Sequence, residues 1–197
     1  MKVKVPNNSL LMGRDCGPGS KHCIGSCYAV KAFKAYPSVK ISWQGNSELL
    51  RTKPEEYFGA ICNYLTRAQP AMYRIHVSGD FISKAHFGRW VQIAERYPGT
   101  SFLAFTKSYR YLPADSNTLP SNFQPVLSLF RSMVGTPEDI PAHLLDSYPL
   151  AFAGGRWEYW DTDYWFRARD AIDCTGICSA KECSLCWRGF DVHFPIH

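Results

Sequence analysis

The sequence predicts an α/β protein built as a partial, open βα barrel with a largely parallel sheet. Short apolar, strand-like runs alternate with helix-like segments along the chain. A complete eight-stranded barrel takes roughly 250 residues, so a chain of 197 residues suits an open barrel of about five or six strands. We expect one domain over residues 1–197. Its barrel core should span residues 1–155, and a small aromatic and cysteine-rich metal module should span residues 156–197.

The front of the chain predicts three helices and a strand. Residues 30–36 form a short helix that ends near Pro37. Residues 52–69 form a second helix, with Thr52 and Glu55 as a capping box and Pro54 in the first turn. Residues 73–80 form a strand that runs into a turn, and residues 83–98 form a third, amphipathic helix.

The rest of the chain predicts further strands. Three apolar runs, at residues 100–108, 124–132 and 148–155, have the composition of buried strands. A short helical turn at residues 136–145 separates two of them, and residues 189–197 read as a last strand.

Three predicted strands end in polar residues. These residues are Ser78, Gly79 and Asp80, then Thr106, Lys107 and Ser108, then Arg131 and Ser132. The carboxyl ends of parallel strands meet at one edge of the sheet, where ligands bind. The simpler alternative is that strand ends are polar because turns are polar. If the edge is functional, it carries one acid, two cations and several hydroxyl groups.

Composition limits the class of protein. No apolar run is long enough to span a bilayer, and the first residues lack the apolar core of a signal peptide, so we expect a cytoplasmic protein and no membrane partner. Residues 1–110 carry 16 Lys and Arg against 6 Asp and Glu, whereas residues 111–197 carry 6 against 11. The basic front favours an anionic partner such as nucleic acid, although scatter around a mildly basic mean is the simpler explanation.

The cysteine pattern predicts metal sites. Seven of the eight cysteines fall into two tight clusters, and a reducing compartment disfavours disulfides. The second cluster consists of Cys174, Cys178, Cys183 and Cys186. Part of it has the C-x4-C-x2-C spacing of plant-type ferredoxins, so an iron–sulfur cluster is favoured there and zinc is the alternative.

The first cluster has only three cysteines: Cys16, Cys23 and Cys27. A closed structural site needs four ligands, whereas three thiolates on a 4Fe–4S cluster leave one iron open. A fourth ligand could instead come from His22, Cys62 or Cys174.

At "CIGSCYA" the chain resembles the radical S-adenosylmethionine (radical-SAM) superfamily, which holds a 4Fe–4S cluster with three cysteines in a loop after the first barrel strand. Across nearly its full length it resembles the phage and plasmid gene product 88 family. That resemblance rests on "CIGSCYA", "IHVSGDF", "FLAFTKS" and "CSLCW" in this order. It implies a small iron–sulfur protein of viral or mobile-element type. The usual superfamily spacing is C-x3-C-x2-C, and this chain departs from it.

The resemblance also implies roles for residues. Cys16, Cys23 and Cys27 would hold the cluster. The cofactor-binding residues would be Ser78, Gly79, Asp80 and Ser108, and the catalytic residues would be Asp80, Lys107 and Arg131. Asp80 would accept from the methionyl ammonium of S-adenosylmethionine, and a serine or lysine at the strand ends would meet its carboxylate.

The sequence supports two hypotheses about function, an enzyme and a non-enzymatic binding module. The leading hypothesis is radical chemistry on a nucleic acid or nucleotide, with the second cluster structural or an electron relay. The alternative is a non-enzymatic iron–sulfur or zinc module that binds DNA or a host protein. The sequence sets no oligomeric state.

Three other features have simpler explanations. Cys62, in an apolar helix, is expected in the core. His76 is expected to be a hydrogen-bonded core histidine. The aromatic segment 154–170 is expected to serve mainly in packing, with a lid or base-stacking surface as the alternative.

Overall fold

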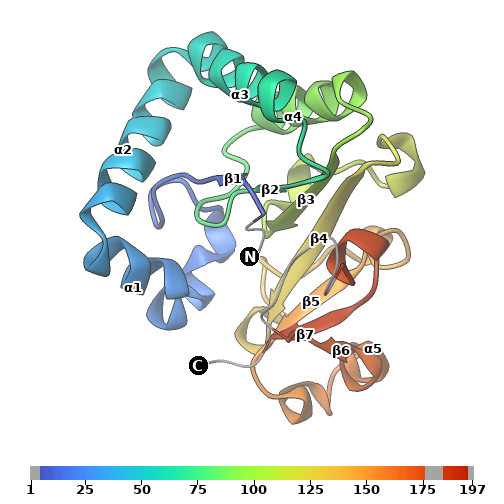
Figure 1. Cartoon of the computed structure of the whole chain (residues 1–197). Coiled ribbons are helices and arrows are strands. Elements are labelled where there is room, and N and C mark those ends of the chain that lie inside the picture. Colours follow the sequence, from blue (N-terminus) through green and yellow to red (C-terminus); the bar gives the residue numbers. More distant parts are fainter. Residues whose placement is uncertain (1–4, 176–183, 195–197) are drawn as a thin grey trace.

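The structure is a computed structural model that describes residues 5–175 and 184–194. Within these residues it forms one seven-stranded sheet in the order β1-β2-β3-β4-β5-β7-β6, and every neighbouring pair is parallel (Figure 1). The strands are β1 (Asn7–Asn8), β2 (Met72–Ile75), β3 (Ser101–Thr106), β4 (Phe123–Phe130), β5 (Leu150–Ala153), β6 (Ile172–Asp173) and β7 (Val192–Phe194).

The sheet is open. Its first five strands lie in the order in which they occur in the chain, as in the wall of a βα barrel, but β1 and β6 remain at opposite edges. The expectation of an open α/β fold with a parallel sheet is therefore confirmed. There are seven strands rather than five or six because β1 and β6 have two residues each, too few to produce an alternating pattern.

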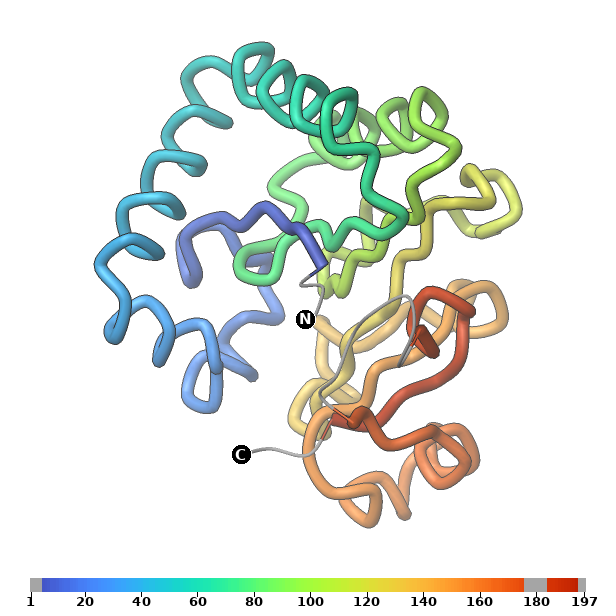
Figure 2. The backbone as a smooth tube through the Cα atoms, in the orientation of Figure 1, coloured from blue at the N-terminus to red at the C-terminus, as the bar shows by residue number. Residues whose placement is uncertain are grey.

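The helices precede or connect the strands. They are α1 (Tyr28–Ala35), α2 (Pro37–Thr52), α3 (Pro54–Ala68), α4 (Lys84–Arg96) and α5 (Trp165–Asp170). Short 3-10 turns are η1 (Pro18–His22), η2 (Ile24–Ser26), η3 (Tyr109–Tyr111), η4 (Ser116–Thr118), η5 (Arg131–Met133), η6 (Ala142–Leu144), η7 (Arg156–Tyr159) and η8 (Cys186–Arg188). Figure 2 shows α1, α2 and α3 as an arc along one side of the molecule.

One sequence expectation about helix ends is confirmed and another is wrong. Helix α1 ends at Ala35, near Pro37 as expected, and Pro37 then occupies the first turn of α2, where no backbone N–H donor is needed. The capping box is absent, because Thr52 ends α2 and donates its hydroxyl to the Glu48 carbonyl at 2.8 Å. Pro54 does begin α3, as expected.

The main core lies between the sheet and the helices α3 and α4. Trp90 of α4 is fully buried and contacts Tyr73 of β2 and Phe102 of β3. Phe58 of α3 packs edge-on against Trp90, with ring centroids 6.0 Å apart. Burial of such aromatic side chains contributes about 1.5–3 kcal/mol each, so this layer fixes the outer face of the sheet.

A smaller cluster covers the other face. Successive strand residues point to opposite faces, so Leu103 lies on the face that Phe102 does not occupy. There Leu103, Val126 and Val192 pack with Cys186, which η8 brings onto this face. The segment 184–190 thus covers the inner face of the open barrel.

The described part of residues 156–197 contains no separate metal module, because β6 and β7 extend the same sheet. Among the described residues no three or more Cys, His, Asp or Glu side chains are gathered to hold a metal ion. Cys178 and Cys183 lie outside the described residues, so the second metal site stays a prediction. No described helix combines the length and apolarity needed to cross a membrane.

The aromatic segment 154–170 is only partly packed. Tyr159 and Tyr164 are buried, as expected. Trp157 is 75% exposed, and Trp160 and Phe166 are also exposed. The packing expectation is therefore wrong for these three side chains.

Candidate metal centre

Residues 10–16 place the first cysteine beside the carboxyl end of β2. The Leu10 amide donates to the Ser78 carbonyl at 2.8 Å, and the Asp80 amide donates to the Asp15 carbonyl at 2.8 Å. These two bonds hold the N-terminal segment on the Ser78–Asp80 turn. Cys16 follows directly, so the turn fixes where the cysteine loop begins.

The contact between residues 10–16 and the Ser78–Asp80 turn requires a glycine at position 79. Its φ is +82°, and a Cβ at this position would lie 2.6 Å from the Leu10 Cβ. Both the backbone conformation and the space therefore exclude a side chain. The close approach made by Gly79 is to the protein's own chain.

The cysteine loop, residues 15–27, lies against the next strand ends. A Cβ on Gly17 would lie 2.9 Å from the Ser108 hydroxyl. A Cβ on Gly19 would lie 3.1 Å from both the Lys107 Cδ and the Met133 Cε. The two glycines let the loop contact the segments that follow β3 and β4, at the edge that the polar strand ends predicted.

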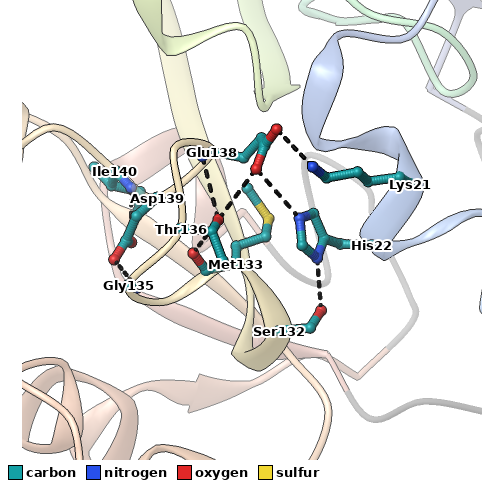
Figure 3. A network of polar contacts seen from close by, with 9 residues as sticks. All are labelled: Lys21, His22, Ser132, Met133, Gly135, Thr136, Glu138, Asp139 and Ile140. Atoms are coloured by element: carbon teal, nitrogen blue, oxygen red, sulfur yellow. Dashed lines mark hydrogen bonds and ion pairs between the residues drawn. The ribbon is translucent and has the colours of Figure 1, made fainter.

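A polar clamp joins the loop to the segment after β4 (Figure 3). Lys21 Nζ lies 2.7 Å from Glu138 Oε1. His22 Nδ1 lies 3.0 Å from the Ser132 hydroxyl, and its Nε2 lies 3.7 Å from Glu138 Oε2. Because both ring nitrogens face these side chains, His22 is not oriented as a fourth metal ligand in this arrangement.

Cys16 and Cys23 interact electrostatically with Lys107 and with each other, and Cys23 also interacts with Cys27. Burial raises the pKa of the Cys16 thiol to about 11, and nearby Asp80 and Cys23 raise it further. Burial also raises the pKa of Cys23, against the lowering effect of Lys107, and Cys27 adds to the rise. Protonated thiols are weak nucleophiles, so Cys16 and Cys23 are not activated as nucleophiles here.

Asp80 is the centre of a buried hydrogen-bond network. One carboxylate oxygen accepts from the Phe81 amide and the Thr106 hydroxyl, and the other accepts from the Lys107 amide, each at 2.7 Å. Burial raises its pKa even though these donors lower it. Asp80 is 6% exposed and ties the β2 end to the β3 end, so here it acts as a positioning group.

The other predicted residues differ in whether their side chains join the hydrogen-bond network around Asp80. The Ser108 hydroxyl donates to the Phe81 carbonyl at 3.0 Å. Ser78 is buried, and its hydroxyl has no hydrogen-bond partner within the described ranges. Lys107 Nζ lies 5.1 Å from the centre of the Phe130 ring. Arg131 Nη2 lies 3.1 Å from Asp161 Oδ1, so Arg131 is not part of the network around the cysteine loop.

The cysteines of the second cluster are only partly described. Cys174 follows β6, and its amide donates to the His193 carbonyl at 2.8 Å. Cys186 is buried on the inner face of the sheet. Cys62 carries a free thiol and packs against the core, as expected. His76 is buried as expected, but its Nε2 has no hydrogen-bond partner in the part of the chain that the structure describes.

Sequence reasoning missed three residues that position the loop. Asp15 is buried and pairs with Arg51 of α2, which holds α2 against the loop. Burial acts to raise the pKa of Asp15, but Ser47 and Arg51 together lower it. Tyr28 donates its hydroxyl to the Val77 carbonyl. Asp15 and Tyr28 flank cysteines in the sequence, which was the available signal, whereas nothing marked Arg51.

The fold and this site define a class: an α/β protein whose open parallel sheet carries a three-cysteine loop at the carboxyl ends of its strands. The chain belongs to the Gene product 88 family, whose profile matches residues 2–153. It is 28% identical over 106 residues to the "Gene 88 protein" of Mycobacterium phage L5. That match covers 48% of this chain and 44% of the relative, less than half of either. No solved structure gives a significant match.

Proposed function

We propose that the cysteine loop holds an iron–sulfur cluster through Cys16, Cys23 and Cys27. The observation that carries the proposal is the position of the cysteine loop at the ligand-binding edge of a parallel sheet, where Cys16 and Cys23 both interact electrostatically with the cation of Lys107. A metal centre turns buried thiols into thiolates, and the lysine offsets part of their charge.

A multi-iron cluster suits a set of three cysteines better than a closed single-ion site. A structural zinc needs four ligands, each about 2.3 Å from the same atom. The thiolates of a 4Fe–4S cluster bind different iron atoms and therefore need wider spacing. Three protein ligands leave one iron that can bind a further molecule.

The Ser78–Asp80 turn already contacts the chain's own Leu10 and Asp15. The Asp80 carboxylate accepts three hydrogen bonds from the described residues, two at Oδ1 and one at Oδ2, so one lone-pair site at Oδ2 remains for the methionyl ammonium of S-adenosylmethionine. We derive no radical step from these residues, and radical-SAM-like chemistry is supported only by the resemblance of "CIGSCYA".

The chain's own residues would keep the cluster in place. Asp80 fixes the backbone of Lys107, while Glu138 and Ser132 hold the loop through Lys21 and His22. The likeness to a phage protein supports a phage or mobile-element origin, and the reducing cytoplasm of a host cell would keep the thiols available. A second iron–sulfur cluster, or zinc, at Cys174, Cys178, Cys183 and Cys186 completes the proposal.

A non-enzymatic binding module is the second candidate. It is supported by the packing of η8 residues on the inner face of the sheet. Barrel enzymes enclose their substrates at this face, and here it is covered. A protein of this kind would use the cluster to hold or sense, and would bind DNA or a host protein at its surface.

Anaerobic purification followed by iron, acid-labile sulfide and zinc analysis tests the proposal. Iron and sulfide in equal amounts are expected, and zinc without iron contradicts it. Adding dithionite and S-adenosylmethionine then separates the two candidates. Formation of 5′-deoxyadenosine supports the enzyme, whereas an intact cluster without cleavage supports the binding module.

A further inference from the structure

Helix α1 and the start of α2 carry exposed lysines and tyrosines. Lys31, Lys34 and Lys40 are all exposed. Tyr28 is 53% exposed and Tyr36 is 60% exposed. Tyr28, Lys31 and Lys34 follow one another at helical spacing, so they lie on one side of α1. These five residues are called the lysine–tyrosine face below.

The lysines of this face have no carboxylate nearby to neutralise them. Between residues 28 and 52 the sequence contains one acid, Glu48, near the far end of α2. No ion pair found in the described ranges involves Lys31, Lys34 or Lys40, although eleven such contacts occur elsewhere. Lys40 instead reaches over the Phe33 ring of α1, with Nζ 5.8 Å from the ring centre. The face is therefore complementary to a polyanion.

Tyr28 is held in position while its ring remains half open. Its hydroxyl donates to the Val77 carbonyl after β2, and Arg74 Nη2 lies 3.4 Å from the same hydroxyl. Both contacts fix the phenol at one end. A fixed aromatic ring with an open surface can stack on a nucleobase with little further loss of conformational freedom. Tyr28 directly follows Cys27, so a base stacked there would lie beside the cysteine loop.

We propose that the lysine–tyrosine face binds single-stranded nucleic acid. The lysines contact phosphates, and Tyr28 stacks on a base. The face offers charge and a ring but no set of side chains arranged to read base edges, so binding is tolerant of sequence. The binding needs no cluster and stands apart from the metal proposal.

An anionic membrane is the main competing partner for a basic helix. The face is poorly suited to it, because Ile41 is the exposed aliphatic residue of α2, and Gln44, Gly45 and Glu48 share its side of the helix. A helix that inserts into a lipid surface needs a continuous apolar side. Vesicle binding is therefore an outcome that the experiment must measure.

Fluorescence anisotropy with a labelled oligothymidylate of about 15 nucleotides, titrated at several salt concentrations, tests the proposal. The double variant Lys31→Glu/Lys34→Glu should weaken binding at least about tenfold and lower the salt slope by about 1.4, which is two phosphate contacts on a single strand. Tyr28→Ala should weaken binding about five- to tenfold, and Tyr28→Phe, which keeps the ring but loses the hydroxyl contacts that fix it, should weaken binding less.

The matched control is Lys84→Glu/Arg96→Glu on α4, which makes the same charge change at exposed positions of a helix far from α1 (Figure 1). It should keep nearly full affinity, and iron content should stay unchanged in the lysine variants. Equal loss in the control variant overturns the proposal, as does absence of binding at low salt. Binding to phosphatidylglycerol vesicles but not to the oligonucleotide also overturns it.

Discussion

The carboxyl ends of β2 and β3 and those of β6 and β7 are built from the same kinds of residue in different surroundings. At the first, Asp80 is buried and accepts hydrogen bonds from three donors within the described chain. At the second, the side chain of Asp173 is 68% exposed and lies 2.7 Å from Arg156 and 2.8 Å from His193. The Asp80 carboxylate links two loops inside the protein, whereas the Asp173 carboxylate makes its ion pairs at the surface.

This difference indicates where the molecule is rigid. A buried acceptor that satisfies several backbone amides allows one arrangement of its loops, because any shift leaves an amide without a partner. Exposed ion pairs are screened and contribute little. The cysteine loop lies over the first region, as expected for a site that must hold several ligands at fixed positions.

The largest effect on stability is expected from substitution of one glycine in each region, Gly79 and Gly154. Gly79→Ala places a Cβ 2.6 Å from Leu10 at a φ of +82°, so strain and overpacking together should lower the free energy of unfolding by about 4 kcal/mol. Gly154→Ala, at a φ of +107°, meets only the flexible Glu158 carboxylate and should lower it by about half as much. Urea denaturation measures both. Equal losses would remove the proposed difference in rigidity.

The second-largest effect on stability is expected from substitution of the two carboxylates, Asp80 and Asp173. Asp80→Asn keeps the shape but turns an amide group toward backbone N–H donors, so it should lower the free energy of unfolding by about 2 kcal/mol. Asp173→Asn should leave the denaturation midpoint unchanged, because the Asp173 side chain is 68% exposed and its ion pair with Arg156 is screened by water. A tolerated Asn at position 80 would mean that the network does not fix the loop.

Sequence patterns predicted much of this fold and less of the site. Periodicity located β2 to β5, α3 and α4 because each buries one face or one stripe. It missed α2, because Pro37, which follows the end of α1 as expected, also begins a second helix. The polar strand ends were correctly expected to meet at one edge. The positioning role of Asp80 was not predictable, because two of the three groups that donate hydrogen bonds to it are backbone amides, which carry no sequence signal.

The smallest effect is expected at the exposed aromatics near β5. The Trp157 ring contacts the Trp165 ring, with centroids 5.3 Å apart, and the neighbouring Arg156 already pairs with Asp173. Trp157→Ala should change the free energy of unfolding by less than about 0.5 kcal/mol and leave oligonucleotide affinity unchanged. Loss of affinity in the anisotropy titration would show that nucleic acid also contacts this side.

The central claim is that Cys16, Cys23 and Cys27 hold an iron–sulfur cluster. The most direct test reconstitutes the protein anaerobically and measures iron and acid-labile sulfide in Cys27→Ala, with Cys62→Ala as the matched control, since Cys62 has a free thiol at a hollow between α3 and α4. We predict that Cys27→Ala loses about four iron and four sulfide per chain while Cys62→Ala loses none. Full iron and sulfide content in Cys27→Ala would contradict the account.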